Sequence, residues 1–184
     1  MYEYNQAGPI AHWSFNEGSG STAHDSIGNN HGTFGTGDSA PSWNNNGKIG
    51  KAISYDGYDR INVGDDKDPN FVSISAWVNI NNYNTSGNYT RIISNTFSYE
   101  LIMYGFSGGE GRLEWKTYTT SGEVNATTPI SKAMSLHNWY HLIATYDGSK
   151  SKIYIIGILS GESDQTGNLV NQNNVSIGGQ STGA

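Results

Sequence analysis

The sequence contains no cysteine in its 184 residues. This absence excludes disulfide bonds, zinc sites built on thiolates, and thiol nucleophiles. It says little about the compartment, because bacterial surface proteins often do without disulfides. Charged residues are also scarce, since they make up 14% of the chain, about half the usual share in soluble proteins. The surface is therefore expected to be largely neutral and polar, which suits ligands rich in hydroxyl groups.

Two further absences exclude whole classes of partner. Ten basic residues stand against 16 acidic ones, for a formal net charge of -6, and the chain has no run of Lys and Arg. A protein that follows nucleic acid phosphates needs such a basic patch, so nucleic acid is not expected as a partner. No stretch approaches the roughly 18 consecutive apolar residues of a membrane-spanning helix, so membrane insertion is not expected either.

Apolar residues recur at every second position in short runs, which clusters of Gly, Asn and Asp separate. No long window carries a helical stripe, so the pattern predicts an all-β fold in one domain over residues 1–184. Asp147 and Gly148 are expected to close a hairpin, because Gly tolerates the positive φ of a tight turn. The expected strands cover residues 10–15, 52–55, 60–63, 71–80, 91–94, 99–104, 112–118, 139–146, 152–156 and 175–177.

Side-chain alternation separates the expected core from the expected surface. It places Trp13 and Phe15 on one face of the first strand, and both are predicted to be core residues, as is Trp115. The strand over residues 139–146 is apolar on both faces, so it should be central. Trp77 faces away from the apolar row of its own strand. Either a further layer of loops covers Trp77, which we favour, or it lies on an exposed sheet face where its ring can stack on a sugar.

Five segments carry the most distinctive motifs of the sequence, in the order of residues 10–34, 50–57, 72–78, 138–148 and 153–159. They include the motifs Gly-Lys-Ala-Ile-Ser-Tyr-Asp-Gly and Asn-Trp-Tyr-His-Leu-Ile-Ala-Thr-Tyr-Asp-Gly. Together they resemble the laminin-G-like, or concanavalin-A-like, lectin domains of bacterial and phage proteins. The resemblance implies a two-sheet antiparallel jelly roll, often with bound calcium, that binds polysaccharides, glycoproteins or partner proteins.

Two features depart from this family. Ile156 stands before Gly157 where family members usually place Asn, and a β-branched residue tolerates positive φ poorly, so the turn must differ or be strained. The strand that usually closes the sheet beside the first strand is missing before Ala184. We therefore expect an open edge along residues 10–15, in a chain that is either a fragment or accepts a strand from a neighbouring chain.

The loop over residues 16–31 is the best candidate for a metal site. Calcium takes roughly six to eight oxygen ligands, and this loop supplies Glu17, Asp25, Asn29 and Asn30. The resemblance also points to a calcium ion near Asp25. The predicted cofactor is therefore a structural Ca²⁺ ion. In the alternative interpretation, Asp25 accepts hydrogen bonds from its own backbone as an Asx turn.

The sequence contains none of the common catalytic signatures. Laminarinase-type relatives carry carboxylates two residues apart on one strand, and no Glu-x-Asp-x-Glu pattern occurs here. Elbows of the Gly-x-Ser-x-Gly type and His-Glu-x-x-His motifs are missing as well. His137 and His141 have zinc-like spacing, but on a strand they would lie about 13 Å apart. Glu114 and Lys116 are expected to form an outward-facing ion pair, and no enzymatic activity is predicted.

Aromatic residues are frequent between residues 83 and 118. Flat apolar rings with polar rims suit pyranose sugars, so we predict that Tyr89, Tyr104 and Tyr118 form a ligand-binding surface. Simple packing is the alternative explanation for each tyrosine.

These observations predict a non-catalytic carbohydrate-binding or adhesive lectin-like module of an extracellular protein, on a bacterial surface, a filament or a phage particle. The expected partner is a glycan or a surface protein. The alternative is a structural assembly or decoration domain that accepts a neighbour's strand along residues 10–15 and binds no sugar. An intrinsic glycoside hydrolase is the third and least supported function.

Overall fold

The computed structural model describes residues 8–64, 70–82, 89–106, 110–129, 134–170 and 174–179. Regular structure in these ranges is almost entirely β-strand, with one short 3-10 helix, η1 (Gly37–Ser39). No helix in these ranges has the length and apolar character that crossing a membrane requires. The predicted all-β fold is therefore confirmed.

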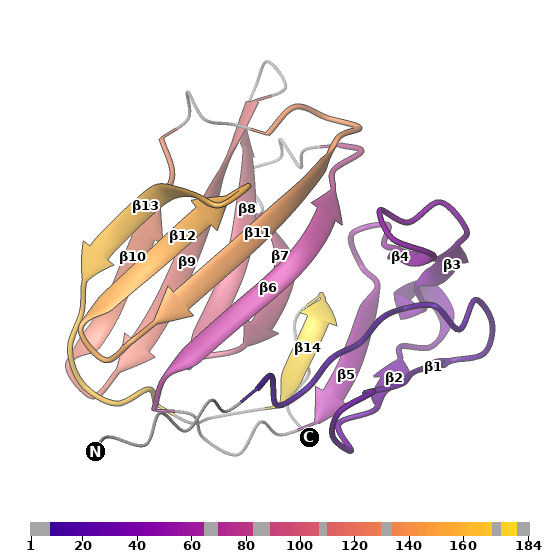
Figure 1. Cartoon of the computed structure of the whole chain (residues 1–184), viewed down its shortest axis with the longest axis horizontal. Helices are drawn as coiled ribbons and strands as arrows, with labels where there is room; N and C mark the ends of the chain where they lie inside the picture. The colour runs from indigo at the N-terminus through magenta and orange to yellow at the C-terminus, as the bar shows by residue number, and fades with distance from the viewer. Residues whose placement is uncertain are drawn as a thin grey trace.

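The strands form two main sheets and one small hairpin (Figure 1). The larger sheet has eight strands in the order β1-β2-β5-β14-β7-β8-β9-β10, the smaller has four in the order β13-β12-β11-β6, and β3 pairs with β4. The strands are β1 (Thr22–Ala23), β2 (Gly32–Phe34), β3 (Ser42–Asn44), β4 (Ala52–Ser54), β5 (Arg60–Gly64), β6 (Val72–Asn79), β7 (Tyr89–Asn95), β8 (Tyr99–Phe106), β9 (Glu110–Thr119), β10 (Gly122–Thr127), β11 (Trp139–Tyr146), β12 (Lys150–Ile155), β13 (Ile158–Asp164) and β14 (Val175–Gly178).

The two sheets pack face to face as an antiparallel sandwich. β9 and β10 contact β12 and β13. In Figure 1 the four-stranded sheet lies in front of β7 to β10, while β1, β2 and β5 extend to one side of it. This is the predicted two-sheet jelly roll. β11 lies between β12 and β6, as its apolar character on both faces predicted.

Alternation along β9 supplies the centre of the core. Leu113, Trp115 and Thr117 point toward the smaller sheet and are almost completely buried. The indole Nε1 of Trp115 donates a hydrogen bond to the carbonyl oxygen of Thr145 in β11, at 3.2 Å. The hydroxyl groups of Thr117 and Ser151 in β12 lie 2.8 Å apart. Hydrogen bonds as well as apolar contacts therefore join the sheets, and the core prediction for Trp115 is confirmed.

Residues 10–15 do not form the predicted strand. Trp13 makes a single bridge, to Asp25, and Phe15 has a φ of 56°, which ends any extended conformation. Both aromatic rings still pack, partly buried, against the core. The prediction of an open sheet edge along residues 10–15 is therefore wrong. Within the described residues, β6 is instead an edge strand of the smaller sheet, because it pairs only with β11.

The turn between β12 and β13 carries the strain that the sequence predicted. Ile156 has a φ of 51° and Gly157 a φ of 76°, and two successive positive φ values are typical of a type I′ hairpin turn. The side chain of Ile156 is 59% exposed, so little packing compensates for the cost of this conformation. The hairpin forms because β12 and β13 pair over their whole length, with one bulge.

Replacing Ile156 with Asn should stabilise the protein, because Asn tolerates positive φ and the isoleucine loses little buried area. We expect the free energy of unfolding to rise by about 1 kcal/mol, measured by denaturant or thermal melting. Ile158→Asn is the matched control, since Ile158 is 65% exposed in the same hairpin with ordinary strand φ. Equal destabilisation by both substitutions would contradict the strain at Ile156.

Candidate functional site

Two of the three predicted tyrosines meet on the outer face of the eight-stranded sheet. Tyr89 on β7 and Tyr104 on β8 are direct partners in the strand register, and their ring centroids lie 5.5 Å apart. Tyr118 also faces outward from β9, next to Phe97, with ring centroids 5.9 Å apart. Arg112 on β9 is the register partner of Tyr104. Tyr118 lies six residues beyond Arg112, so it is roughly 20 Å from Arg112 along the strand. We call this surface the tyrosine face.

Charged side chains fill the tyrosine face around these rings. The guanidinium of Arg91 lies 4.6 Å from the centre of the Tyr89 ring, and its Nη2 donates a hydrogen bond to the Tyr89 hydroxyl at 2.9 Å. Arg112 lies 5.3 Å from the centre of the Tyr104 ring. Its Nε is buried and has no hydrogen-bond partner among the described residues, so a donor remains unused at this ring. Such cation–ring contacts hold the tyrosines in defined positions.

Carboxylates balance these cations. Glu100 is buried and accepts hydrogen bonds from Nε of Arg91 and from the Ser94 hydroxyl, each at 2.8 Å. Lys116 Nζ lies 3.8 Å from Glu114 and 3.6 Å from Glu123. The expected pair between Glu114 and Lys116 is confirmed, although Glu114 is only 4% exposed. Cations and carboxylates alternate, so the face has little net charge among the described residues.

The ionisation states on this face favour hydrogen bonding to hydroxyl groups. Burial and the negative charge of Glu114 raise the pKa of Tyr104 above its ordinary value of 10.0. Burial and the charges of Glu100 and Glu123 likewise raise the pKa of Tyr118. Both phenols therefore keep their protons at neutral pH and can donate. Burial alone would lower the pKa of Lys116, but Tyr104 and the nearby carboxylates raise it, so Lys116 stays charged.

Sequence reasoning found the tyrosines but not their charged neighbours. Arg91, Arg112 and Glu100 are not among the predicted site residues, because each is a single charged residue with uncharged neighbours in the sequence. Period-two alternation does place Arg112 on the same face of β9 as Tyr118. Which strand lies beside which, and in what register, cannot be read from one sequence. The pairing of Tyr104 with both Tyr89 and Arg112 therefore needed the structure.

Trp77 lies on the outer face of the other sheet. Its side chain is 41% exposed, so the favoured prediction that loops cover it is wrong. The ring contacts His141 on β11, with centroids 5.1 Å apart. The Nε2 atom of His141 lies 2.8 Å from the Ser75 hydroxyl, in keeping with the expected packed, hydrogen-bonded strand residue.

The loop over residues 16–31 is organised around Asp25, which is 5% exposed. Its Oδ1 accepts the backbone N–H groups of His12 and Ile27, at 2.9 and 3.0 Å, and its Oδ2 accepts that of Asn30, at 3.1 Å. Burial raises the pKa of Asp25, but these bonds and one from Gly28 outweigh it and lower the pKa to about 2. Four amides occupy roughly four acceptor positions of the carboxylate, as in the predicted Asx turn.

The four residues predicted to bind calcium do not converge in this conformation. Asn30 contributes its backbone, whose carbonyl accepts the Trp13 indole N–H at 2.7 Å, and Asn29 is exposed. Oε1 of Glu17 accepts a hydrogen bond from the His24 amide, while its buried Oε2 has no partner in the part of the chain that the structure describes. Within the described ranges, no group of three or more His, Cys, Asp or Glu could hold a metal. Calcium binding stays a prediction, and it would require Asp25 to give up amide bonds.

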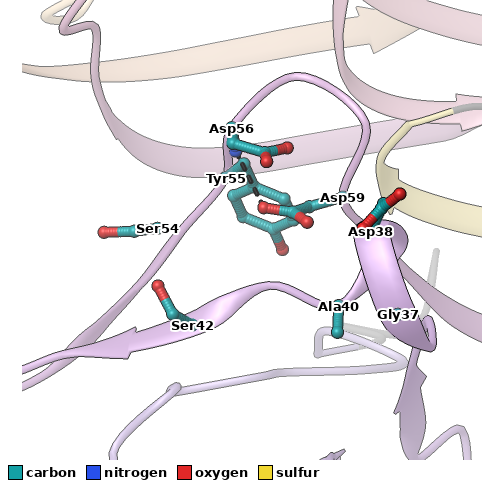
Figure 2. A pocket seen from close by; sticks show the side chains of 8 residues that line it. All are labelled: Gly37, Asp38, Ala40, Ser42, Ser54, Tyr55, Asp56 and Asp59. Carbon is teal, nitrogen blue, oxygen red and sulfur yellow. Dashed lines mark hydrogen bonds between the residues drawn. The ribbon is translucent and has the colours of Figure 1, made fainter.

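An open pocket of about 390 Å³ lies between η1 and the turn that joins β4 to β5 (Figure 2). Its described lining includes Asp38, Asp56 and Asp59, and the backbone N–H of Asp56 donates to Asp59 at 2.8 Å. Burial, together with the charge of Asp56, raises the pKa of Asp59. Tyr55 also lines the pocket, but its hydroxyl is buried and has no hydrogen-bond partner within the described ranges. The pocket offers acceptors but no exposed ring, so it suits sugar stacking less well than the tyrosine face.

A family profile described as the concanavalin A-like lectin/glucanases superfamily matches residues 54–184. The chain belongs to this superfamily. The match covers most of both sheets, including every strand of the tyrosine face, and confirms the resemblance found in the sequence. A search of curated protein sequences gave no match.

Solved structures of this superfamily fold resemble the chain at low sequence identity. Domain 4 of AbnA, a GH43 extracellular arabinanase from Geobacillus stearothermophilus in complex with arabinotriose, shares 22% identity with a TM-score of 0.64. The comparison covers 92% of this chain and 81% of that domain. The binding domain of botulinum neurotoxin DC in complex with SialylT shares 15% identity, with a TM-score of 0.53, over 85% of this chain and 40% of its own length. At these identities the likeness establishes the fold alone.

Asp25→Asn should destabilise the protein at neutral pH by about 1–3 kcal/mol, because backbone amides lose a charged acceptor. Since folding lowers the pKa of Asp25 from 3.8 to about 2, its contribution is present above pH 3.8 and is lost as the pH falls through 2. Thermal melting should therefore show a difference between variant and parent that shrinks at low pH. A difference independent of pH would contradict the role of the carboxylate.

The same melts, run with calcium and with a chelator, test the metal prediction.

Proposed function

We propose that the protein is a non-catalytic carbohydrate-binding module that holds an oligosaccharide on the tyrosine face. The observation that carries this proposal is the register pairing of Tyr89 with Tyr104, whose rings share the outer face of one sheet with Tyr118. Aromatic rings stack on the apolar faces of sugars, while the surrounding charged groups bond hydroxyl pairs. The separation between Tyr104 and Tyr118 suits an extended oligosaccharide better than a single sugar.

The electrostatics of the face support a neutral glycan. Each described carboxylate on it lies close to a cation, with Glu100 against Arg91 at 2.8 Å and Glu114 against Lys116 at 3.8 Å. A ligand with uncharged hydroxyl groups can exchange hydrogen bonds with such pairs without adding unbalanced charge. Arabino-oligosaccharides are suitable first probes, because domain 4 of AbnA was solved with arabinotriose. We place the module outside the cell, where a polysaccharide ligand is accessible.

The same ion pairs argue against catalysis. A glycoside hydrolase needs one carboxylic acid that gives up a proton and one free carboxylate. Glu100 accepts hydrogen bonds from Arg91 and Ser94, so it is held in an ion pair and is not a free carboxylate. We therefore propose that bound oligosaccharides are released uncleaved.

Tyr104→Ala and Tyr118→Ala should each weaken oligosaccharide binding by about tenfold, which is the loss expected when one stacking ring is removed. A glycan array identifies the ligand, calorimetry measures the affinity, and a reducing-end assay should detect no cleavage. Tyr58→Ala is the matched control, since Tyr58 is 77% exposed in the turn before β5, away from this face. Unchanged affinity in both test variants would remove the tyrosine face as the site.

A second candidate function, assembly through strand exchange, rests on the edge of β6. β6 spans eight residues without a charge, a proline or a bulge, and within the described residues it pairs with β11 alone. Its inward residues Val72 and Ile74 are only partly buried, whereas Leu142 and Ala144 on β11 are about 1% exposed or less. An edge of this kind favours the addition of a strand from a neighbouring chain. This proposal replaces the edge expected along residues 10–15.

If β6 accepts a strand, alternate β6 amides should exchange hydrogen rapidly in the dilute protein and slowly once a neighbour pairs with them. Hydrogen exchange at several protein concentrations, with light scattering for mass, measures both effects. The amides of β11 serve as the internal control, because β6 and β12 protect them on both sides. Protection of all β6 amides in a dilute monomer would exclude strand addition.

A further inference from the structure

Several exposed large hydrophobic residues lie on the outer side of the four-stranded sheet, on the opposite side of the sandwich from the tyrosine face. Trp77 is 41% exposed there, and Ile156 and Leu159 are 59% and 43% exposed. The backbone N–H of Ile156 bonds to the carbonyl of His141, which is the register partner of Trp77. β6, β11 and the turn between β12 and β13 therefore bring Trp77, His141 and Ile156 into one row, and exposed apolar side chains in such a row mark a binding surface.

A lysine from a distant loop adds a positive charge to this row. The Nζ atom of Lys48, in the connection between β3 and β4, lies 5.2 Å from the centre of the Trp77 ring. Lys48 is exposed and forms no ion pair with any residue that the structure describes. By contrast, Lys150 and Lys152 on β12 both face carboxylates. Among the described residues, Lys48 is thus a cation without a carboxylate partner beside an exposed ring, in a chain whose net charge is -6.

Hydrogen-bonding groups complete the surroundings of the ring. Ser75 lies two residues before Trp77 on the same face of β6, and its hydroxyl is 2.8 Å from Nε2 of His141. Either group can also bond a ligand hydroxyl at the rim of the ring. A ligand that satisfies all of these contacts needs an apolar face, hydroxyl groups and one negative charge.

We infer that Lys48, Trp77 and His141 form a second glycan site, which takes a sugar that bears a carboxylate. The carboxylate pairs with Lys48, the C–H face of the sugar ring lies against the exposed part of Trp77, and sugar hydroxyls bond His141 or Ser75. This inference rests on the proposed carbohydrate-binding function, but it uses the opposite sheet and a charged ligand. The near-neutral tyrosine face and the Lys48 site would then select different sugars.

The test titrates the full chain with a uronate oligosaccharide, with its neutral methyl ester and with a sialylated oligosaccharide, so that the two common carboxylated sugars are distinguished. Lys48→Gln should weaken binding of the carboxylated sugar about tenfold, because one charge-assisted contact is lost, and should leave the ester unaffected. Trp77→Ala should weaken binding of both acid and ester. Lys150→Gln is the matched control: it removes one positive charge from β12 of the sheet that carries Trp77, at a lysine paired with Asp164, and should change nothing.

Two outcomes separate this inference from the proposed function. If the tyrosine variants abolish neutral glycan binding while Lys48→Gln and Trp77→Ala change no affinity, the second site is wrong and the tyrosine face stands. If the carboxylated sugar binds through Lys48 while the tyrosine variants lose nothing, the tyrosine face is wrong and the second site stands. Binding of an acidic peptide through Lys48, with no binding of either carboxylated sugar, would also overturn the inference. Melting temperatures of all variants serve as the folding control.

Discussion

The contact of Trp115 with the opposite sheet is the constraint on which the rest of the structure depends. Its indole is fully buried and donates a hydrogen bond to the Thr145 carbonyl at 3.2 Å. This contact fixes the position of β9 relative to β11 in the opposite sheet. Because successive side chains on a strand point to opposite faces, fixing Trp115 inward also fixes Glu114 and Lys116 outward. The chemistry of the tyrosine face is therefore a consequence of the packing beneath it.

The sandwich has two outer faces with different chemistry. On the larger sheet, cations and carboxylates pair closely, which leaves rings and hydroxyl groups as the distinguishing features. On the smaller sheet, an exposed indole lies beside Lys48 of the β3–β4 connection, which forms no ion pair with any described residue. A fold that presents two flat faces can thus hold two sugar contacts without enclosing a deep cavity. Several of the few charged residues in the chain are used in ion pairs on these faces.

The sequence predicted the strands that show clear alternation of apolar and polar residues. It did not predict the contacts that depend on which strands lie side by side. β11, with its apolar residues on both faces, was placed within its range and as a central strand. β10 and β13 were missed because they are mostly polar, and β1 because it has only two residues. The strand expected at residues 10–15 failed at Phe15, whose positive φ no pattern indicates. Tyr104 was identified, but its contacts with Tyr89 and Arg112 depend on strand order. The exposure of Trp77 depends on which loops reach it.

The central claim is that an oligosaccharide binds across the outward residues of β7, β8 and β9. The most direct measurement is a titration of the isotope-labelled protein with the best glycan, followed by backbone chemical shifts. The account predicts that the largest shift changes fall on alternate residues of these strands, from Tyr104 to Tyr118, while those of the buried core residues Leu113 and Trp115 stay small. Shift changes confined to the pocket around Asp59, or to the loop around Asp25, would contradict it.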